Sequence, residues 1–100
     1  MPRSVIVYSD EALADLDSIC DHIAAQSGGP RAAAVMARIQ RTVATVSFVP
    51  GIGRKRKELR GEPHVFPAPP WLIIYRPLSD RRGILVLRIV DGRRDVADIL

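Results

Sequence analysis

Two groups of arginine and lysine side chains are the residues of this sequence best suited to chemistry with a partner. The first is the run Arg54-Lys55-Arg56-Lys57-Glu58-Leu59-Arg60, in which five cations and one acid give a net charge of +4. The second is Arg93 with Arg94, directly after the turn signal Asp91-Gly92. A guanidinium can grip a carboxylate or a phosphate with two parallel hydrogen bonds. The sequence therefore predicts an anionic partner, either a nucleic acid or an acidic protein segment.

Each group also has a purely structural interpretation. The basic run is equally consistent with a solvated loop, and Arg93 and Arg94 are consistent with ion pairs that shape the end of the chain. Arg88, within an otherwise apolar segment, is expected to point to solvent, to pair with an acid or to contact a partner. The candidate acids are Asp95 and Asp98 for all three arginines, and also Asp91 for Arg93 and Arg94.

The sequence carries no signature of a metal or nucleotide site, so we expect no metal and no cofactor. Cys20, His22 and His64 lack the spacing of metal ligands. Gly51-Ile52-Gly53 lacks the preceding strand and following helix of a nucleotide-binding loop, and we interpret it as a turn. The lone Cys20 cannot form an internal disulfide and is expected to be a small buried residue of the first helix.

Composition predicts one soluble domain over residues 1–100. Hydrophobic residues make up 47% and charged residues 26% of the chain, which is ordinary for a globular protein. Apolar runs are too short for a membrane helix, and the N-terminus does not resemble a signal peptide, so we expect a cytoplasmic protein with no membrane contact. Residues 1–50 carry a net charge of −1 and residues 51–100 a net charge of +5.

The first half of the chain predicts a strand followed by two helices. Val5–Tyr8 is β-branched and aromatic, as in strands. A helix is expected to begin after a cap at Ser9 or Asp10 and to end at Ser27-Gly28-Gly29. A second helix follows from Pro30 and ends before Pro50. The apolar stripes that place these helices against a core are Leu13, Leu16, Cys20 and Ile23 in the first, and Ala32, Met36, Ile39, Val43 and Val46 in the second.

The second half predicts strands. A short strand is expected around His64–Phe66, followed by strands at Trp71–Arg76 and Ile84–Val90, while the last five residues fit a short strand or a helical turn. Trp71 and Tyr75 are expected to pack in or around the core. The order β-α-α-β-β-β predicts an α+β domain, in which a helix hairpin packs on one face of a mostly antiparallel sheet. The first strand must lie beside a late strand, because it has no sequential neighbour.

Three segments carry a family resemblance: Pro50–Arg54, Trp71–Arg76 and Leu87–Asp95. Their order and spacing resemble the RelE/ParE superfamily of bacterial toxins, and more closely its ParE branch. The resemblance implies a toxin with a cognate ParD-like antitoxin, in a hetero-oligomer that contacts DNA indirectly through the antitoxin. It also implies DNA gyrase as the target, because ParE-branch members inhibit gyrase, whereas RelE-branch members cut messenger RNA on the ribosome.

The RelE-type ribonuclease residues are mostly missing from this sequence. The resemblance implies an arginine where Leu72 stands, an arginine at Arg94 and a tyrosine where Leu100 stands. Two leucines can neither hold a phosphate nor move a proton. We therefore predict no catalytic residues and assign target binding to Arg88, Arg93 and Arg94, and antitoxin or nucleic-acid contact to the basic run. A ribosome-dependent endoribonuclease and a non-toxic antitoxin-binding module stay as alternatives.

Overall fold

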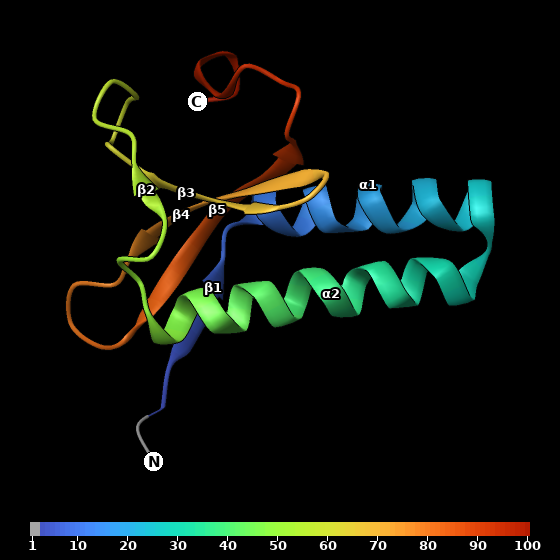
Figure 1. Cartoon of the computed structure of the whole chain (residues 1–100), viewed down its shortest axis with the longest axis horizontal. Helices are drawn as coiled ribbons and strands as arrows, with labels where there is room; N and C mark the ends of the chain where they lie inside the picture. Colours follow the sequence, from blue (N-terminus) through green and yellow to red (C-terminus); the bar gives the residue numbers. More distant parts are fainter. Residues whose placement is uncertain (1–2) are drawn as a thin grey trace.

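The computed structural model describes residues 3–100, which form two helices and a single mixed sheet (Figure 1). The elements in order are β1 (Val5–Tyr8), α1 (Asp10–Ser27), α2 (Gly29–Phe48), β2 (Arg54–Lys55), β3 (His64–Ala68), β4 (Trp71–Pro77), β5 (Gly83–Asp91) and the 3₁₀ helix η1 (Val96–Asp98). The predicted α+β class is confirmed. The sequence analysis missed the two-residue strand β2, which is too short to leave a pattern and exists because it pairs with β3.

The sheet has the strand order β1-β5-β4-β3-β2. The pairs β2–β3, β3–β4 and β4–β5 are antiparallel, whereas β1 runs parallel to β5 with Val5 opposite Gly83 and Tyr8 opposite Val86. This confirms that the first strand lies beside a late one. Gly83 has a φ of 143°, and a Cβ there would collide with the carbonyl of Val5, so this register depends on glycine.

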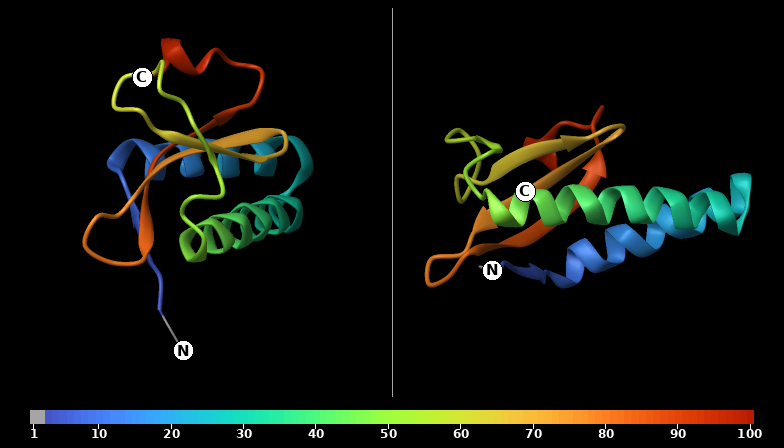
Figure 2. Two further views of the ribbon diagram at one scale, coloured as in Figure 1. Left: turned by 60° about the vertical axis from the view of Figure 1, so that its left-hand side comes forward. Right: turned by 60° about the horizontal axis from the view of Figure 1, so that its bottom comes forward.

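The two helices form an antiparallel hairpin on one face of the sheet and extend beyond its end (Figures 1 and 2). The Ser9 hydroxyl caps α1 by accepting a hydrogen bond of 3.0 Å from the Ala12 amide. Gly28, with a φ of 88°, ends α1 and precedes α2, which has proline in its first turn. Each expected helix start and end is confirmed to within one or two residues.

The predicted stripe of α1 is partly wrong. Leu13 is 47% exposed, and Cys20 is only partly buried. The face toward the sheet instead holds Ala12, Leu16, Ile19 and Ile23. In this orientation of α1 the carboxylate of Asp15 faces β5, whereas Leu13 lies toward solvent. The stripe of α2 is confirmed, with Val35 as an additional member.

Apolar side chains pack on both faces of the sheet. The larger cluster lies between the sheet and the helices and includes the fully buried Tyr75, with Trp71 packed against it, as expected for these two aromatic residues. The smaller cluster lies on the opposite face, where the C-terminal segment folds over the sheet as a helical turn (Figure 2). Its members are Leu59, Val65, Leu72, Ile74, Leu87, Val90, Val96, Ile99 and Leu100.

Two features of residues 3–100 bear on function. No helix in this range combines the length and apolar character that a membrane crossing requires. The same residues contain no group of three histidine, cysteine, aspartate or glutamate side chains arranged to hold a metal ion.

Candidate functional site

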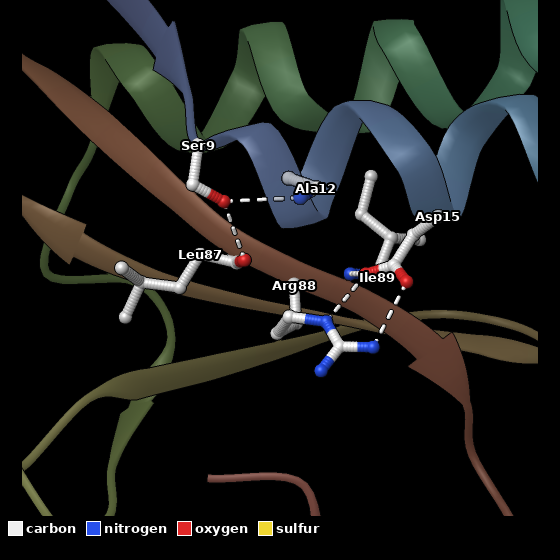
Figure 3. Close-up of polar contacts among 6 residues, drawn as sticks. All are labelled: Ser9, Ala12, Asp15, Leu87, Arg88 and Ile89. Carbon is white, nitrogen blue, oxygen red and sulfur yellow. Dashed lines mark hydrogen bonds and ion pairs between the residues drawn. The ribbon is translucent and has the colours of Figure 1, made fainter.

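The C-terminal half of β5 carries Arg88 and leads directly to Arg93 and Arg94, and its outer edge is completed by α1 rather than by a strand. Beyond Val86, β5 extends past the end of β1 and, within residues 3–100, has no strand partner on this side. The Ser9 amide donates to the Val86 carbonyl at 2.9 Å, and the Ser9 hydroxyl donates to the Leu87 carbonyl at 2.7 Å. Farther along, a carboxylate oxygen of Asp15 accepts from the Ile89 amide at 2.9 Å (Figure 3). Ser9, the cap of α1, and the Asp15 side chain within α1 thus replace the missing strand and satisfy backbone groups of β5.

Arg88 is held by the same carboxylate. Its Nε lies 2.8 Å from Oδ2 of Asp15 and its Nη2 lies 3.0 Å from Oδ1, which is a two-pronged ion pair (Figure 3). The side chains of Arg88 and Asp15 are 26% and 15% exposed. Hydrogen bonding to Asp15 raises the pKa of Arg88 further above its ordinary value. The expected pairing with an acid is therefore present, but the expected partners Asp95 and Asp98 were wrong.

A backbone irregularity helps to place Arg88. Ile74 of β4 lies opposite Arg88, whereas Tyr75 lies opposite Val86, so one residue of β5, Leu87, is extra at this point. Such a bulge changes the alternation of side chains along a strand. Val86 and Ile89, three residues apart, consequently both pack toward the helices, although a regular strand would place them on opposite faces.

Arg93 forms an ion pair with Asp91, which was one of the two interpretations of this residue. Its Nη2 lies 3.0 Å from Oδ2 of Asp91, and its backbone amide donates to Oδ1 of Asp91 at 2.9 Å. The hydrogen bond from Arg93 lowers the pKa of Asp91 to about 2, so Asp91 stays ionised. The Arg93 side chain is nevertheless 91% exposed and presents its charge to solvent at the end of β5.

Arg94 borders a cavity of about 250 Å³ between α1 and the ends of β4 and β5. Apolar walls come from both layers and include Ile19, Ile23 and Trp71, while Asp91 and Arg94 lie at the strand end. A cavity with apolar walls and charged side chains at one end suits an apolar partner side chain flanked by a polar group. His22 also lines this cavity.

The basic run is divided among different environments. Arg54 and Lys55 form β2, the outermost strand of the sheet, and both are exposed. Arg56 pairs with Glu58 at 2.8 Å, and this hydrogen bond lowers the pKa of Glu58. Lys57 is exposed in the loop after β2. The run is thus neither a wholly solvated loop nor one continuous surface.

Arg60 shares a second cavity, of about 510 Å³, with Arg76 and Arg88. Folding therefore brings one residue of the basic run beside one of the predicted target-binding residues. The sequence analysis missed Arg76, whose guanidinium lies against Gly61, a residue with a φ of 79° and no side chain to obstruct it. It also missed Asp15, because a single aspartate on a helix carries no signal that it will reach a strand 73 residues away.

Leu72 and Leu100 stand at two of the three positions where the resemblance implies ribonuclease residues, and both lie in apolar surroundings. Leu72 and Leu100 both pack against the smaller cluster, around Val90 and Val96. Arg94 borders the cavity beside α1. Neither leucine offers a group that can exchange a proton or hold a phosphate.

The turn predicted at Gly51–Gly53 is confirmed, and it is attached to the core by a tyrosine. The Tyr75 hydroxyl donates to the Pro50 carbonyl at 2.7 Å and accepts from the Gly53 amide at 2.9 Å. His64 lies beside Tyr75 with ring centroids 5.4 Å apart, and its Nδ1 is buried without a hydrogen-bond partner among residues 3–100. Burial lowers the pKa of His64 below 6.5.

Comparisons with known proteins agree with this architecture. The family model described as ParE toxin of type II toxin-antitoxin system, parDE, matches residues 6–96. The chain is 32% identical over 83 residues to Toxin ParE3 of Caulobacter vibrioides, which covers 83% of this chain and 81% of that protein. A solved structure described as the chromosomal ParDE TA system from P. aeruginosa superposes with a TM-score of 0.73 at 25% identity, over 88% of this chain and 95% of that chain.

Proposed function

The chain belongs to the ParE toxin family of type II toxin-antitoxin systems, and from that premise we propose that it inhibits DNA gyrase by binding, with no covalent step of its own. A ParDE system implies a cognate ParD antitoxin. In this proposal, the protein acts in the bacterial cytoplasm, and a ParD-like antitoxin holds it in an inactive hetero-oligomer. That complex contacts DNA through the antitoxin.

The observation that carries the binding mechanism is the packing of Leu72 and Leu100 in the smaller apolar cluster. Metal-free RNA cleavage needs a group to take a proton, a group to return one and a cation for the phosphorane. These two leucines supply none of them at the positions where the resemblance implies an arginine and a tyrosine. A lone Arg94 can orient an anion, but it cannot complete the proton transfers.

The end of β5 is the surface we assign to the target. Arg93 projects into solvent beside Asp91, and Arg94 borders the apolar cavity next to α1. The pair between Arg88 and Asp15 fixes the strand from which these residues project. We therefore assign direct target contact to Arg93 and Arg94, and we propose that the remaining exposed part of Arg88 contributes at the margin.

A supercoiling assay with purified, antitoxin-free protein tests this proposal. We expect dose-dependent loss of gyrase supercoiling, with linear plasmid DNA released after detergent and protease. The double variant Arg93→Glu, Arg94→Glu should lose this effect and keep its fold. The control Arg81→Glu, Arg82→Glu makes the same charge change in the exposed β4–β5 turn and should inhibit normally.

Other outcomes would replace the proposal. Full inhibition by the Arg93→Glu, Arg94→Glu variant would move the target site elsewhere. Intact supercoiling, together with cleaved messenger RNA soon after induction in cells, would favour the ribosome-dependent ribonuclease. Normal growth during strong expression without antitoxin would favour a non-toxic antitoxin-binding module.

The antitoxin contact is assigned to the edge strand β2 and the loop after it. Arg54 and Lys55 are exposed on the last strand of the sheet, and Lys57 and Arg60 follow them. An edge strand can accept an extended segment, and these cations favour one that carries acids. The variant Arg54→Glu, Lys55→Glu should weaken binding of the cognate antitoxin in calorimetry, whereas Arg81→Glu, Arg82→Glu should not. Equal affinity of all three proteins would remove this assignment.

A further inference from the structure

The exposed face of α2 carries a row of cations that no function discussed so far uses. Arg31, Arg38 and Arg41 are spaced by seven and three residues, which places them on one face of a helix. All three are exposed, and the 20 residues of α2 include no aspartate or glutamate. Within residues 3–100, none of the ion pairs involves these arginines. We call Arg31, Arg38 and Arg41 the α2 arginine row.

The row borders hollows in the surface and is partly fixed in position. Nη2 of Arg38 donates to the Pro69 carbonyl at 3.0 Å. The three arginines line a cavity of about 170 Å³, and Arg38 also borders one of about 320 Å³ beside β3. Arginines that are already oriented lose less conformational freedom when they bind an anion.

The residues between the arginines on α2 favour a phosphate backbone over a protein partner. Between Arg31 and Thr45 this face carries Ala34, Thr42 and Thr45, which are small. The hydroxyls of both threonines donate to carbonyls of α2 at 3.1 Å, so they are already satisfied. Protein interfaces are usually centred on a buried aromatic or large aliphatic anchor. The nearest exposed one on α2, Phe48, lies about two turns beyond Arg41.

We propose that the α2 arginine row binds the phosphodiester backbone of a double-stranded nucleic acid directly. The row spans about 15 Å along the helix axis, and duplex DNA carries a phosphate charge about every 1.7 Å of its axis, so three simultaneous contacts are geometrically reasonable. Such contacts release counterions and carry no sequence information. This inference is independent of gyrase inhibition and adds a direct contact to the indirect one through the antitoxin.

The test measures salt dependence by fluorescence anisotropy, using a labelled DNA duplex of about 20 base pairs and an RNA duplex of the same sequence. In the triple variant Arg31→Gln, Arg38→Gln, Arg41→Gln, the slope of log K against log salt should become shallower by about 2.7, because each phosphate contact contributes about 0.9. Glutamine has a helix propensity close to that of arginine, so α2 should persist. The matched control Arg3→Gln, Arg81→Gln, Arg82→Gln removes the same charge from exposed positions and should keep the wild-type slope.

A second variant controls for loss of fold, because Arg38 also donates a hydrogen bond to the Pro69 carbonyl. The double variant Arg31→Gln, Arg41→Gln leaves this contact in place and should make the slope shallower by about 1.8. Preference for the DNA or for the RNA duplex identifies the source of the phosphates.

Three results would overturn the inference. The first is that the wild-type protein binds neither duplex at low salt. The second is that the control triple variant changes the slope as much as the α2 variants do, which would mean that only net charge matters. The third is that poly-L-glutamate binds through the α2 arginine row as tightly as the duplexes, which would indicate an acidic protein partner.

Discussion

The carboxylate of Asp15 is the single side chain whose removal should most disturb the end of β5. It accepts two hydrogen bonds from Arg88 and one from the Ile89 amide, and only 15% of the Asp15 side chain is exposed. Asp15→Ala leaves a guanidinium without its partner and a backbone N–H without an acceptor. Because Asp15 lies in the interior of α1, the variant tests this contact without changing a helix cap.

The magnitude follows from the exposure of the two partners. Breaking a fully buried ion pair by removing one partner costs about 3–5 kcal/mol. Arg88 keeps 26% of its side chain exposed and can reach water, which reduces the loss to about 3 kcal/mol. Alanine gains about 0.5 kcal/mol of helix propensity over aspartate. We expect a net loss of about 2–3 kcal/mol in the free energy of unfolding, or about 10–20 °C in Tm for a domain of this size.

Urea unfolding followed by the fluorescence of Trp71, the only tryptophan, measures this loss. Asp17→Ala, at an exposed acid on the same helix, serves as the control and should change stability by less than about 0.5 kcal/mol. Arg88→Met should also destabilise the protein, because it leaves the Asp15 carboxylate without its cation and with only the Ile89 amide as a hydrogen-bond donor. The stabilising role of Asp15 is contradicted if Asp15→Ala is no more destabilising than Asp17→Ala, or if a double-mutant cycle between Asp15 and Arg88 gives no coupling.

Three further predictions concern single residues of the core and the sheet. Since burial lowers the pKa of His64 below 6.5, the stability that depends on its neutral ring is complete above pH 6.5 and decreases as the pH falls. His64→Phe should therefore reduce the loss of unfolding free energy between about pH 7.5 and about pH 5.5, and an equal loss in both proteins would contradict this. Tyr75→Phe removes the hydroxyl that holds the loop after α2 and should cost about 1–3 kcal/mol in urea unfolding, so an unchanged midpoint would argue against that role. Gly83→Ala places a Cβ against the Val5 carbonyl and should increase hydrogen exchange of the β1 amides, whereas unchanged protection would show that the register tolerates a side chain.

Much of the fold was predictable because local patterns and tertiary packing agree. The cap at Ser9, the glycines after Ser27 and the apolar period of α2 each act within a few residues, and the structure confirms them. The β-branched segments predicted β1, β4 and β5 as strands. Because β1 has no neighbouring strand in sequence, it was expected to pair with a late strand, and it pairs with β5. The orientation of α1 was not predictable to the same degree, since Leu13 and Ala12 both continue an apolar period.

The candidate site was less predictable because its residues interact over long sequence separations. Charge composition located the cations of the basic run and of the end of β5. It did not show that Arg88 pairs with Asp15, that Arg76 lies against Gly61, or that Arg60 and Arg76 share a cavity with Arg88. Each of these contacts joins different elements, and no local rule of propensity or spacing relates such residues.

The amino-acid sequence was sufficient to predict the α+β order, the helix boundaries and the core of α2, and it places leucine at positions 72 and 100. These depend on residue type and on periodicity along one element. Only the folded structure shows which acid pairs with Arg88, how α1 completes the edge of β5, and which cations share a surface. Those outcomes depend on the bulge in β5 and on where β1 ends relative to its partner. Such features arise only when distant segments pack together. In each case, backbone groups that lack a strand partner in one element are hydrogen-bonded by a residue of another element.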